Sequence, residues 1–237
     1  MAESANTKLT FKRYEKKYTL TPQQYEAFMN TAKEHLIPDE FHKSLVLSIY
    51  YDSDDYDLIR HSIEGPVYKE KLRVRSYGVP EDGDTVFVEL KKKYKGIVYK
   101  RRVAMKCIEA ERWLSGNAAA PEDTQITREI DFFLSQNDVK PKAFIGADRI
   151  SWVDKDDPEL RFTFDHSIKW RSEDLSLTKG SGGENLLEDG CVLMEIKIPG
   201  SAPLWLAHLL SEESIFPASY SKYGTCYKKE LLSRRFG

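Results

Sequence analysis

Polar and apolar residues alternate along several stretches of the chain, and this period of two predicts β-strands. The clearest case is YKEKLRVRSY at residues 68–77. One face of this strand carries a basic residue at every position, namely Lys69, Lys71, Arg73 and Arg75. Leu72 and Val74 fall on the other face, and we expect helices to cover them.

Alternation of this kind predicts eight strands in the whole chain. They cover residues 10–20, 44–52, 67–78, 84–95, 97–106, 143–153, 159–170 and 190–198. A period near 3.6 predicts helices over 21–36, 108–116, 125–136, 202–212 and 221–235. The segment 176–190 contains three closely spaced glycines and is expected to be a loop.

The start of the first helix has a clear capping signal. Thr21 suits the N-cap, Pro22 suits the first helical position, and Gln24 completes a capping-box pattern. Gly116 suits the residue that follows a helix end. Strands with interspersed helices indicate an α+β protein built on an antiparallel sheet or barrel. We expect a single domain over residues 1–237, with a flexible segment at 1–9.

Composition excludes several classes of protein. Hydrophobic residues make up 41% of the chain, which is enough for a core and argues against wholesale disorder. The net charge of −2 gives no overall basic field that would recruit nucleic acid. Cys107, Cys191 and Cys226 are widely spaced, which favours a reducing compartment over disulfides or structural zinc. Because no signal peptide or apolar membrane span is present, we expect a cytoplasmic protein without direct membrane insertion.

The polar faces of the predicted strands consist mainly of Arg and Lys. They hold Arg13, Glu15 and Lys17, then Lys69, Lys71, Arg73 and Arg75, then Glu89, Lys91 and Lys93, then Lys100 and Arg102, then Arg149, then Arg161, Thr163 and Asp165, and finally Glu195 and Lys197. The ordinary interpretation is the solvated outer face of an antiparallel sheet. However, Ser, Gln and Asn are almost absent from these faces, and like charges across a sheet repel unless an anion lies against them.

If the sheet closes with these faces inward, they line a basic tunnel. Arg and Lys bind phosphate oxygens, and the few carboxylates suit Mg²⁺ or Mn²⁺. The pattern therefore favours a polyanion held together with a divalent metal ion.

Seven short motifs occur in order over nearly the whole chain: RYEKKY (13–18), KLRVR (71–75), VELKKK (88–93), YKRR (99–102), RFTFD (161–165), LMEIKIPG (193–200) and SKY (221–223). Together they resemble the VTC domain, the polyphosphate polymerase branch of the CYTH-like triphosphate tunnel metalloenzymes. Arg13 stands where the wider superfamily has Glu, which is the VTC-like variant. Ala147 and Ser219 depart from the family pattern, which has Tyr and Lys there.

The resemblance implies an eight-stranded antiparallel β-barrel tunnel with a basic interior and helices outside. It implies that Mn²⁺ or Mg²⁺ supports transfer of the γ-phosphate of ATP to a growing inorganic polyphosphate chain. It assigns catalysis to Lys17, Arg73, Arg75, Lys91, Glu195 and Lys222. It assigns phosphate binding to Arg13, Lys71, Lys100, Arg102, Arg149, Arg161, Lys197 and Ser221, and metal binding to Glu195 and Glu15.

Two other functions remain open at this point: a tunnel triphosphatase acting on inorganic or nucleoside triphosphates, and a non-catalytic polyphosphate-binding module. The expected partners are ATP and polyphosphate. Nucleic acid is not expected, because the aromatic residues mostly fall on the opposite strand faces. A membrane-protein partner is expected if the product crosses a membrane. The four aspartates at 52, 54, 55 and 57 are interpreted as a solvated turn rather than a metal site.

Overall fold

The computed structural model of the protein describes residues 13–95 and 97–231. The expected flexible segment 1–9 and the expected helical residues 232–235 lie outside this range. The strands are β1 (Arg13–Leu20), β2 (Leu36–Asp52), β3 (Tyr68–Tyr77), β4 (Thr85–Tyr94), β5 (Ile97–Lys106), β6 (Lys140–Asp154), β7 (Arg161–Arg171), β8 (Glu184–Asn185) and β9 (Val192–Pro199). The helices are α1 (Pro22–Ala32), α2 (Asp57–Ile63), α3 (Cys107–Leu114), α4 (Gln125–Gln136), α5 (Leu204–Glu212) and α6 (Lys222–Cys226), with a 3₁₀ turn at Leu177–Lys179 and a π-helical turn at Tyr227–Leu231.

The strands form one sheet in the order β1-β9-β7-β6-β2-β3-β4-β5, with the short β8 paired to β7. The ladders β1–β9, β7–β9, β2–β3, β3–β4 and β4–β5 are all antiparallel, so the predicted α+β fold is confirmed. Closure into a barrel is not found. The order is an open path, and no ladder joins β1 to β5 among the described residues. The charged residues that alternate along both end strands are typical of sheet edges left unpaired.

The chain divides into two compact units. The first takes Met1–His42, Ile150–Asp165 and Gly190–Ser219, and the second takes Lys43–Arg149, His166–Asp189 and Tyr220–Gly237. Each unit has its own hydrophobic core. The single domain expected over residues 1–237 stays a prediction.

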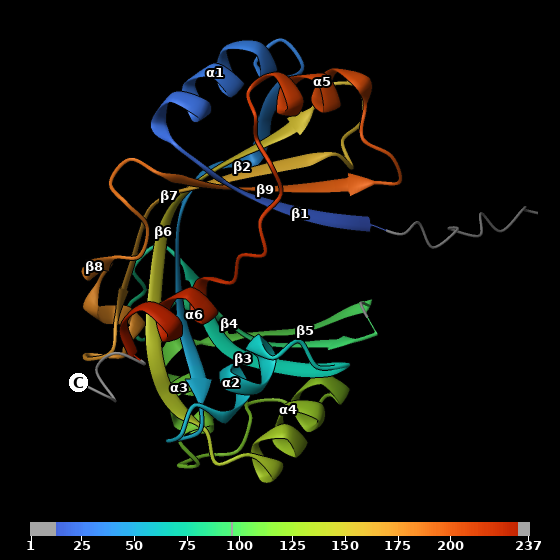
Figure 1. Cartoon of the computed structure of the whole chain (residues 1–237). Coiled ribbons are helices and arrows are strands. Elements are labelled where there is room, and N and C mark those ends of the chain that lie inside the picture. Colours follow the sequence, from blue (N-terminus) through green and yellow to red (C-terminus); the bar gives the residue numbers. More distant parts are fainter. Residues whose placement is uncertain (1–12, 96, 232–237) are drawn as a thin grey trace, which may run out of the picture. The chain divides into compact units, whose positions relative to one another are not determined.

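In the first unit, α1 and α5 cover one face of β1, β9 and β7 (Figure 1). Phe28 of α1 and Leu206 of α5 pack there with Phe162, Phe164 and Ile196. The predicted capping box is confirmed, because the Thr21 hydroxyl accepts from the Gln24 amide and the Gln24 side chain accepts from the Thr21 amide, both at 3.2 Å. Alternation along the strands leaves the polar residues on the opposite face.

In the second unit, α3 and α4 cover one face of β2, β3, β4 and β5. Leu72 and Val74 are buried there, as predicted, beside Leu90, Trp113 of α3 and Phe133 of α4. Burial of these side chains fixes the register, since a shift by one residue would move the whole basic row into the core.

Several elements differ from the predictions, including the helix predicted at 221–235, which is α6 (Lys222–Cys226) followed by a π-helical turn. Helix α1 ends at Ala32 rather than at 36, because Leu36 already begins β2, which is longer than the strand predicted at 44–52. Helix α2 was not predicted, and β8 lies inside the segment expected to be a loop. Gly116 follows α3 with φ +76°, as its predicted role requires. Within the described part of the chain, no helix has the length and hydropathy needed for a membrane crossing.

Candidate functional site

The second unit gathers basic side chains on the sheet face opposite its core. Cross-strand pairing places them in rows: Arg73 opposite Glu89 and Arg102, Lys71 opposite Lys91 and Lys100, and Lys69 opposite Lys93. We call this surface the basic face; it comprises Lys69, Lys71, Arg73, Arg75, Lys91, Lys93, Lys100 and Arg102. The row of three lysines is unfavourable for the sheet by itself, since like charges directly opposite one another repel.

Glu89 is the one carboxylate on this face among the described residues of β3, β4 and β5. Its side chain is 1% exposed and accepts from three cations. Arg73 Nε and Nη2 lie 2.7 Å from Oε2. Arg102 Nε lies 2.6 Å and Lys100 Nζ 2.7 Å from Oε1, and Arg102 Nη2 also contacts Oε1. Glu89 therefore fixes the position of the basic side chains that surround it.

These charges decide the ionisation of Glu89. Burial alone would raise its pKa, but the charges of Arg73 and Arg75 and the hydrogen bond from Lys100 outweigh burial and hold the pKa well below its usual range. The carboxylate therefore stays ionised at neutral pH. Glu89 is one negative charge against eight positive charges on the basic face, and this excess suits an anionic ligand.

Strand β2 supplies hydroxyl groups to the same face. Arg73 Nη1 donates to the Tyr50 hydroxyl at 3.1 Å, and Arg75 Nε donates to the Ser48 hydroxyl at 3.3 Å. Burial raises the pKa of Tyr50, but Arg73, Arg75 and Lys222 outweigh it and lower the pKa to about 8. Tyr50 was not among the predicted site residues.

Arg75 has a lowered pKa because burial and the neighbouring charge of Arg73 both disfavour its cationic form, with a smaller effect from Arg149. Arg149 is therefore near enough to Arg75 for its charge to act on it, and its role in phosphate binding stays a prediction. Arg102 lies over the Phe87 ring, with its guanidinium carbon 4.5 Å from the ring centroid. These arginines are held in place by packing as well as by charge.

Helix α6 brings two more predicted residues to the basic face. Ser221 is the N-cap of this helix, and its hydroxyl accepts from Lys71 Nζ at 3.0 Å and from the Gly224 amide at 3.2 Å. Lys222 follows it and contributes to the lowered pKa of Tyr50. Tyr223 stacks on Tyr50 with the ring centroids 4.9 Å apart.

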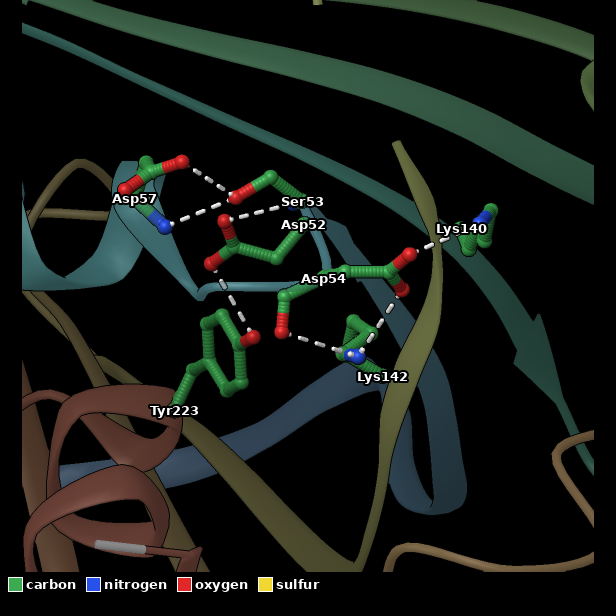
Figure 2. A network of polar contacts seen from close by, with 7 residues as sticks. All are labelled: Asp52, Ser53, Asp54, Asp57, Lys140, Lys142 and Tyr223. Atoms are coloured by element: carbon green, nitrogen blue, oxygen red, sulfur yellow. Dashed lines mark hydrogen bonds and ion pairs between the residues drawn. The ribbon is translucent and has the colours of Figure 1, made fainter. Parts of the chain in front are cut away.

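A buried carboxylate fixes α6 at the end of β2 (Figure 2). Asp52 is 0% exposed, and its Oδ2 accepts from the Tyr223 hydroxyl at 3.1 Å. The same carboxylate accepts from the amides of Ser53, Leu58 and Ile59, at 2.9, 2.9 and 3.0 Å. Burial raises the pKa of Asp52, although these hydrogen bonds oppose the shift.

The prediction of a solvated turn is therefore wrong for Asp52, because its oxygens satisfy buried amides at the start of α2. Asp54 does lie at the surface, where it pairs with Lys140 at 2.8 Å and with Lys142 at 3.5 Å (Figure 2). Among the described residues, no group of three or more His, Cys, Asp or Glu is arranged to hold a metal ion.

The first unit holds the predicted metal ligands on the polar face of its strands. Lys17 Nζ lies 3.3 Å from Glu195 Oε1 and 3.5 Å from Glu15 Oε1. Two carboxylates on the neighbouring strands β1 and β9 thus converge on one cationic group. A pair of carboxylates fits Mg²⁺ or Mn²⁺ when phosphate oxygens and water complete the coordination, since Mg²⁺ is commonly bound in this way.

The other predicted residues of the first unit are more exposed. Lys197 lies opposite Glu15 on β1 and opposite Arg161 on β7. Arg161 is exposed and already has local partners, Asp39 at 3.8 Å and the Pro158 carbonyl at 3.2 Å. Arg13 pairs with Pro199 in the β1–β9 ladder, but its side chain lies outside the described part of the structure.

The structure thus divides the predicted site residues between the two units. The second holds Arg73, Arg75, Lys91, Lys222, Lys71, Lys100, Arg102, Arg149 and Ser221; the first holds Lys17, Glu195, Glu15, Arg161, Lys197 and the backbone of Arg13. Their roles stay predictions.

The predictions missed Glu89, Tyr50, Asp52 and Tyr223. Glu89 could have been found, because it alternates with Lys91 on the same strand. Tyr50 and Tyr223 carry no such signal, because their place depends on the pairing of β2 and the docking of α6.

Comparison with known proteins gives a consistent result. A family model described as VTC domain matches residues 12–231. A solved structure from Bacillus halodurans, described as a candidate adenylate cyclase, superposes with TM-score 0.55 and 14% identity, covering 94% of this chain and 96% of that one. A candidate adenylyl cyclase from Hippeastrum, whose description reports a dominant triphosphatase activity, gives TM-score 0.50 and 14% identity, covering 92% and 95%. At this identity the two likenesses show a shared fold. No curated protein matches the sequence.

Replacement of Glu89 by Gln should destabilise the protein by about 1–3 kcal/mol, because three partly buried cations lose their counter-charge. Thermal unfolding at neutral pH measures this loss. Added inorganic triphosphate should stabilise Glu89→Gln more than the wild type, since it supplies the missing negative charge. Glu70→Gln is the control. Glu70 meets one cation, Lys92 at 3.6 Å, and its hydrogen bond with the Tyr68 hydroxyl can be kept by Gln, so the change should cost under about 1 kcal/mol.

The pH dependence has a definite sign. The pKa of Glu89 is lowered from 4.5, so its stabilisation is complete above that pH and is lost as the pH falls below it. The difference in stability between wild type and Glu89→Gln should therefore shrink in acid. A difference that stays constant or grows below pH 4.5 would contradict the assigned role of Glu89.

Tyr50→Phe should remove one tyrosine that ionises near pH 8, as followed by tyrosinate absorbance. Because the pKa of Tyr50 is lowered from 10.0, wild type should gain stability over the variant as the pH rises from 8 to 10. Bound triphosphate should move the transition to higher pH, since an anion disfavours tyrosinate. Tyr18→Phe is the control: burial raises the pKa of Tyr18, so the transition near pH 8 should persist. If the transition near pH 8 persisted in Tyr50→Phe, its assignment to Tyr50 would be refuted.

Proposed function

Because the chain belongs to the VTC domain family, we propose that it is a metal-dependent polyphosphate polymerase that transfers the γ-phosphate of ATP to a growing inorganic polyphosphate chain. The observation that carries this proposal is the basic face of the second unit. There, eight Lys and Arg side chains share one sheet face with the buried carboxylate of Glu89, and three of them contact it. Such an excess of ordered positive charge suits a linear polymer of phosphates, since each phosphate oxygen can accept from several donors.

The proposed chemistry asks for positioning and charge neutralisation. The terminal phosphate oxygen of the chain attacks the γ-phosphorus of ATP, a new P–O–P link forms, and the bond to the β-phosphate breaks to release ADP. The attacking oxygen is already anionic, so no general base is needed. Arg73, Arg75 and Arg102 would neutralise the equatorial oxygens of the transferring group, because their guanidinium groups are held by Glu89, Ser48 and Phe87.

The remaining predicted residues would bind phosphates of the chain from the strand or helix on which each lies. Lys71, Lys91 and Lys100 form the cross-strand row that would bind successive phosphates of the chain. Ser221 and Lys222 would contact phosphates from the start of α6, and Arg149 would add charge from β6. We propose the same binding role for Lys17, Arg161, Lys197 and Arg13 in the first unit.

A divalent ion fits the carboxylate pair of the first unit. Glu195 and Glu15 would hold Mn²⁺ or Mg²⁺, and the ion would supply further neutralisation of phosphate oxygens when bound. Lys17 would hold the two carboxylates close together, because its ammonium group lies within 3.5 Å of both.

A tunnel triphosphatase is the second candidate function. The protein of similar fold from Hippeastrum is described by a dominant triphosphatase activity, and hydrolysis of triphosphate would use the same phosphate contacts with water as nucleophile. We place the reaction in the cytoplasm, with ATP and polyphosphate as ligands and without nucleic acid. A membrane protein would be the partner if the product is moved across a membrane.

Incubation of the purified protein with ATP and Mn²⁺ tests the proposal. Acid-labile chains that lengthen with time on a sizing gel are expected. Release of phosphate from ATP or inorganic triphosphate without chain growth would instead establish the triphosphatase. Binding of polyphosphate without any turnover would overturn both enzymes in favour of a binding module.

Glu195→Gln separates the metal from the phosphate contacts. Turnover should fall by at least about a hundredfold, because transition-state charge loses its metal neutralisation. Polyphosphate binding, measured by calorimetry without metal, should stay within about threefold of wild type, since the basic side chains are unchanged. Glu26→Gln on the exposed face of α1 is the matched control and should leave turnover unchanged. Full activity in Glu195→Gln would remove this residue from the metal site.

A further inference from the structure

The end of the β4–β5 hairpin and the adjoining start of β3 carry an exposed apolar cluster. We call this the hairpin tip; it comprises Val67, Tyr68, Tyr94, Ile97, Val98 and Tyr99. Each of these side chains is between 43% and 62% exposed. Single exposed apolar residues are ordinary, but a contiguous group of them marks an interaction surface.

Strand pairing shows that apolar side chains lie on both faces of the hairpin tip. Tyr68 lies opposite Tyr94, and Tyr94 lies opposite Ile97, so the three form one row across β3, β4 and β5. Val98 and Tyr99 follow on β5, opposite Lys93 and Lys92. Because successive side chains of a strand point to opposite faces, Tyr99 shares the face of Ile97, whereas Val98 lies with Lys93 on the other face. The tip therefore presents aromatic and aliphatic side chains on three neighbouring strands, with lysines directly beside them.

The charge around the tip is mainly positive. The chain contains no Asp or Glu from Leu90 to Ile108, whereas the same stretch holds eight Lys and Arg residues. Glu70, on the neighbouring strand, already faces Lys92 at 3.6 Å. Lys95 stands at the turn, with its ammonium nitrogen 5.4 Å from the centroid of the Tyr94 ring. Apolar side chains with lysines beside them complement a ligand surface that has an apolar interior and anionic groups at its boundary with water.

We propose that the hairpin tip docks the protein on an anionic lipid surface. Lys93 and Lys95 would bind lipid phosphates and carboxylates, Ile97 and Val98 would enter the boundary of the acyl chains, and the tyrosines would lie at headgroup level. Tyrosine is enriched at that depth, and lysines near an anionic bilayer add attraction that salt weakens. This inference rests on the tip alone and not on the proposed polymerase activity.

Two other occupants fit less well. Polyphosphate complements the lysines but gains nothing from contact with Ile97 and Val98. A second copy of the chain docked tip to tip would bring Lys93 and Lys95 against their own counterparts without a compensating carboxylate. The combination of exposed apolar side chains and a predominantly positive charge therefore favours lipid.

Vesicle flotation with the purified full chain tests the proposal. The protein should float with vesicles of phosphatidylcholine and phosphatidylserine, and at least about tenfold less with phosphatidylcholine alone. The double variant Ile97→Ser and Val98→Ser should bind the anionic vesicles about tenfold less, and Lys95→Glu about fivefold less. Phe216→Ser is the matched control, since it removes a 73% exposed aromatic residue of the first unit and should bind like wild type.

Three results with vesicles contradict the proposal. Absence of flotation with anionic vesicles, equal binding to neutral vesicles, or unchanged binding by the double variant would each overturn it. A dimer in light scattering that the double variant dissociates would show that the tip is an interface between copies. Affinity for inorganic triphosphate should be the same in wild type and double variant. A parallel loss of both kinds of binding would show that the double variant has disturbed the basic face.

Discussion

The buried carboxylate of Glu89 is the interaction on which the second unit depends. It accepts hydrogen bonds from Arg73, Arg102 and Lys100, which come from strands on both sides of its own. Without it, the basic side chains would repel one another across three strands. With it, they are ordered and still carry more positive charge than the carboxylate offsets. Specific anion binding requires this state, in which donors are fixed in place before the ligand arrives.

The sequence predicted the faces of the sheet well, because burial and alternation are local properties. The basic row from Lys69 to Arg75 and the buried Leu72 and Val74 follow from a period of two and are seen in β3. The capping box at Thr21 and the positive φ of Gly116 also depend only on neighbours in the chain. Closure of the sheet could not be predicted in this way, because it depends on which edges pair over long distances.

The site shows a similar division. Arg73 and Lys100 could be assigned from their strand faces, but their shared dependence on Glu89 required the register of β4 between β3 and β5. Tyr50 has no local signal of a role in the site, because that role follows from the pairing of β2 with β3, which places its hydroxyl beside Arg73. Asp52 looked like part of an acidic turn, because nothing in its neighbourhood reveals that Tyr223 and the amides of α2 enclose it.

The contact between Asp52 and Tyr223 has a consequence for the order of folding. These residues are 171 positions apart, and Lys71 and Ser221 are 150 apart, whereas the β3–β4 and β4–β5 ladders join neighbouring strands. Local hairpins form quickly, while contacts of such large separation must first overcome the entropy of closing a long loop. We therefore expect the β3–β4 and β4–β5 hairpins of the basic face to form before α6 docks. Ser221, Lys222 and Tyr223 then complete a surface that is already ordered.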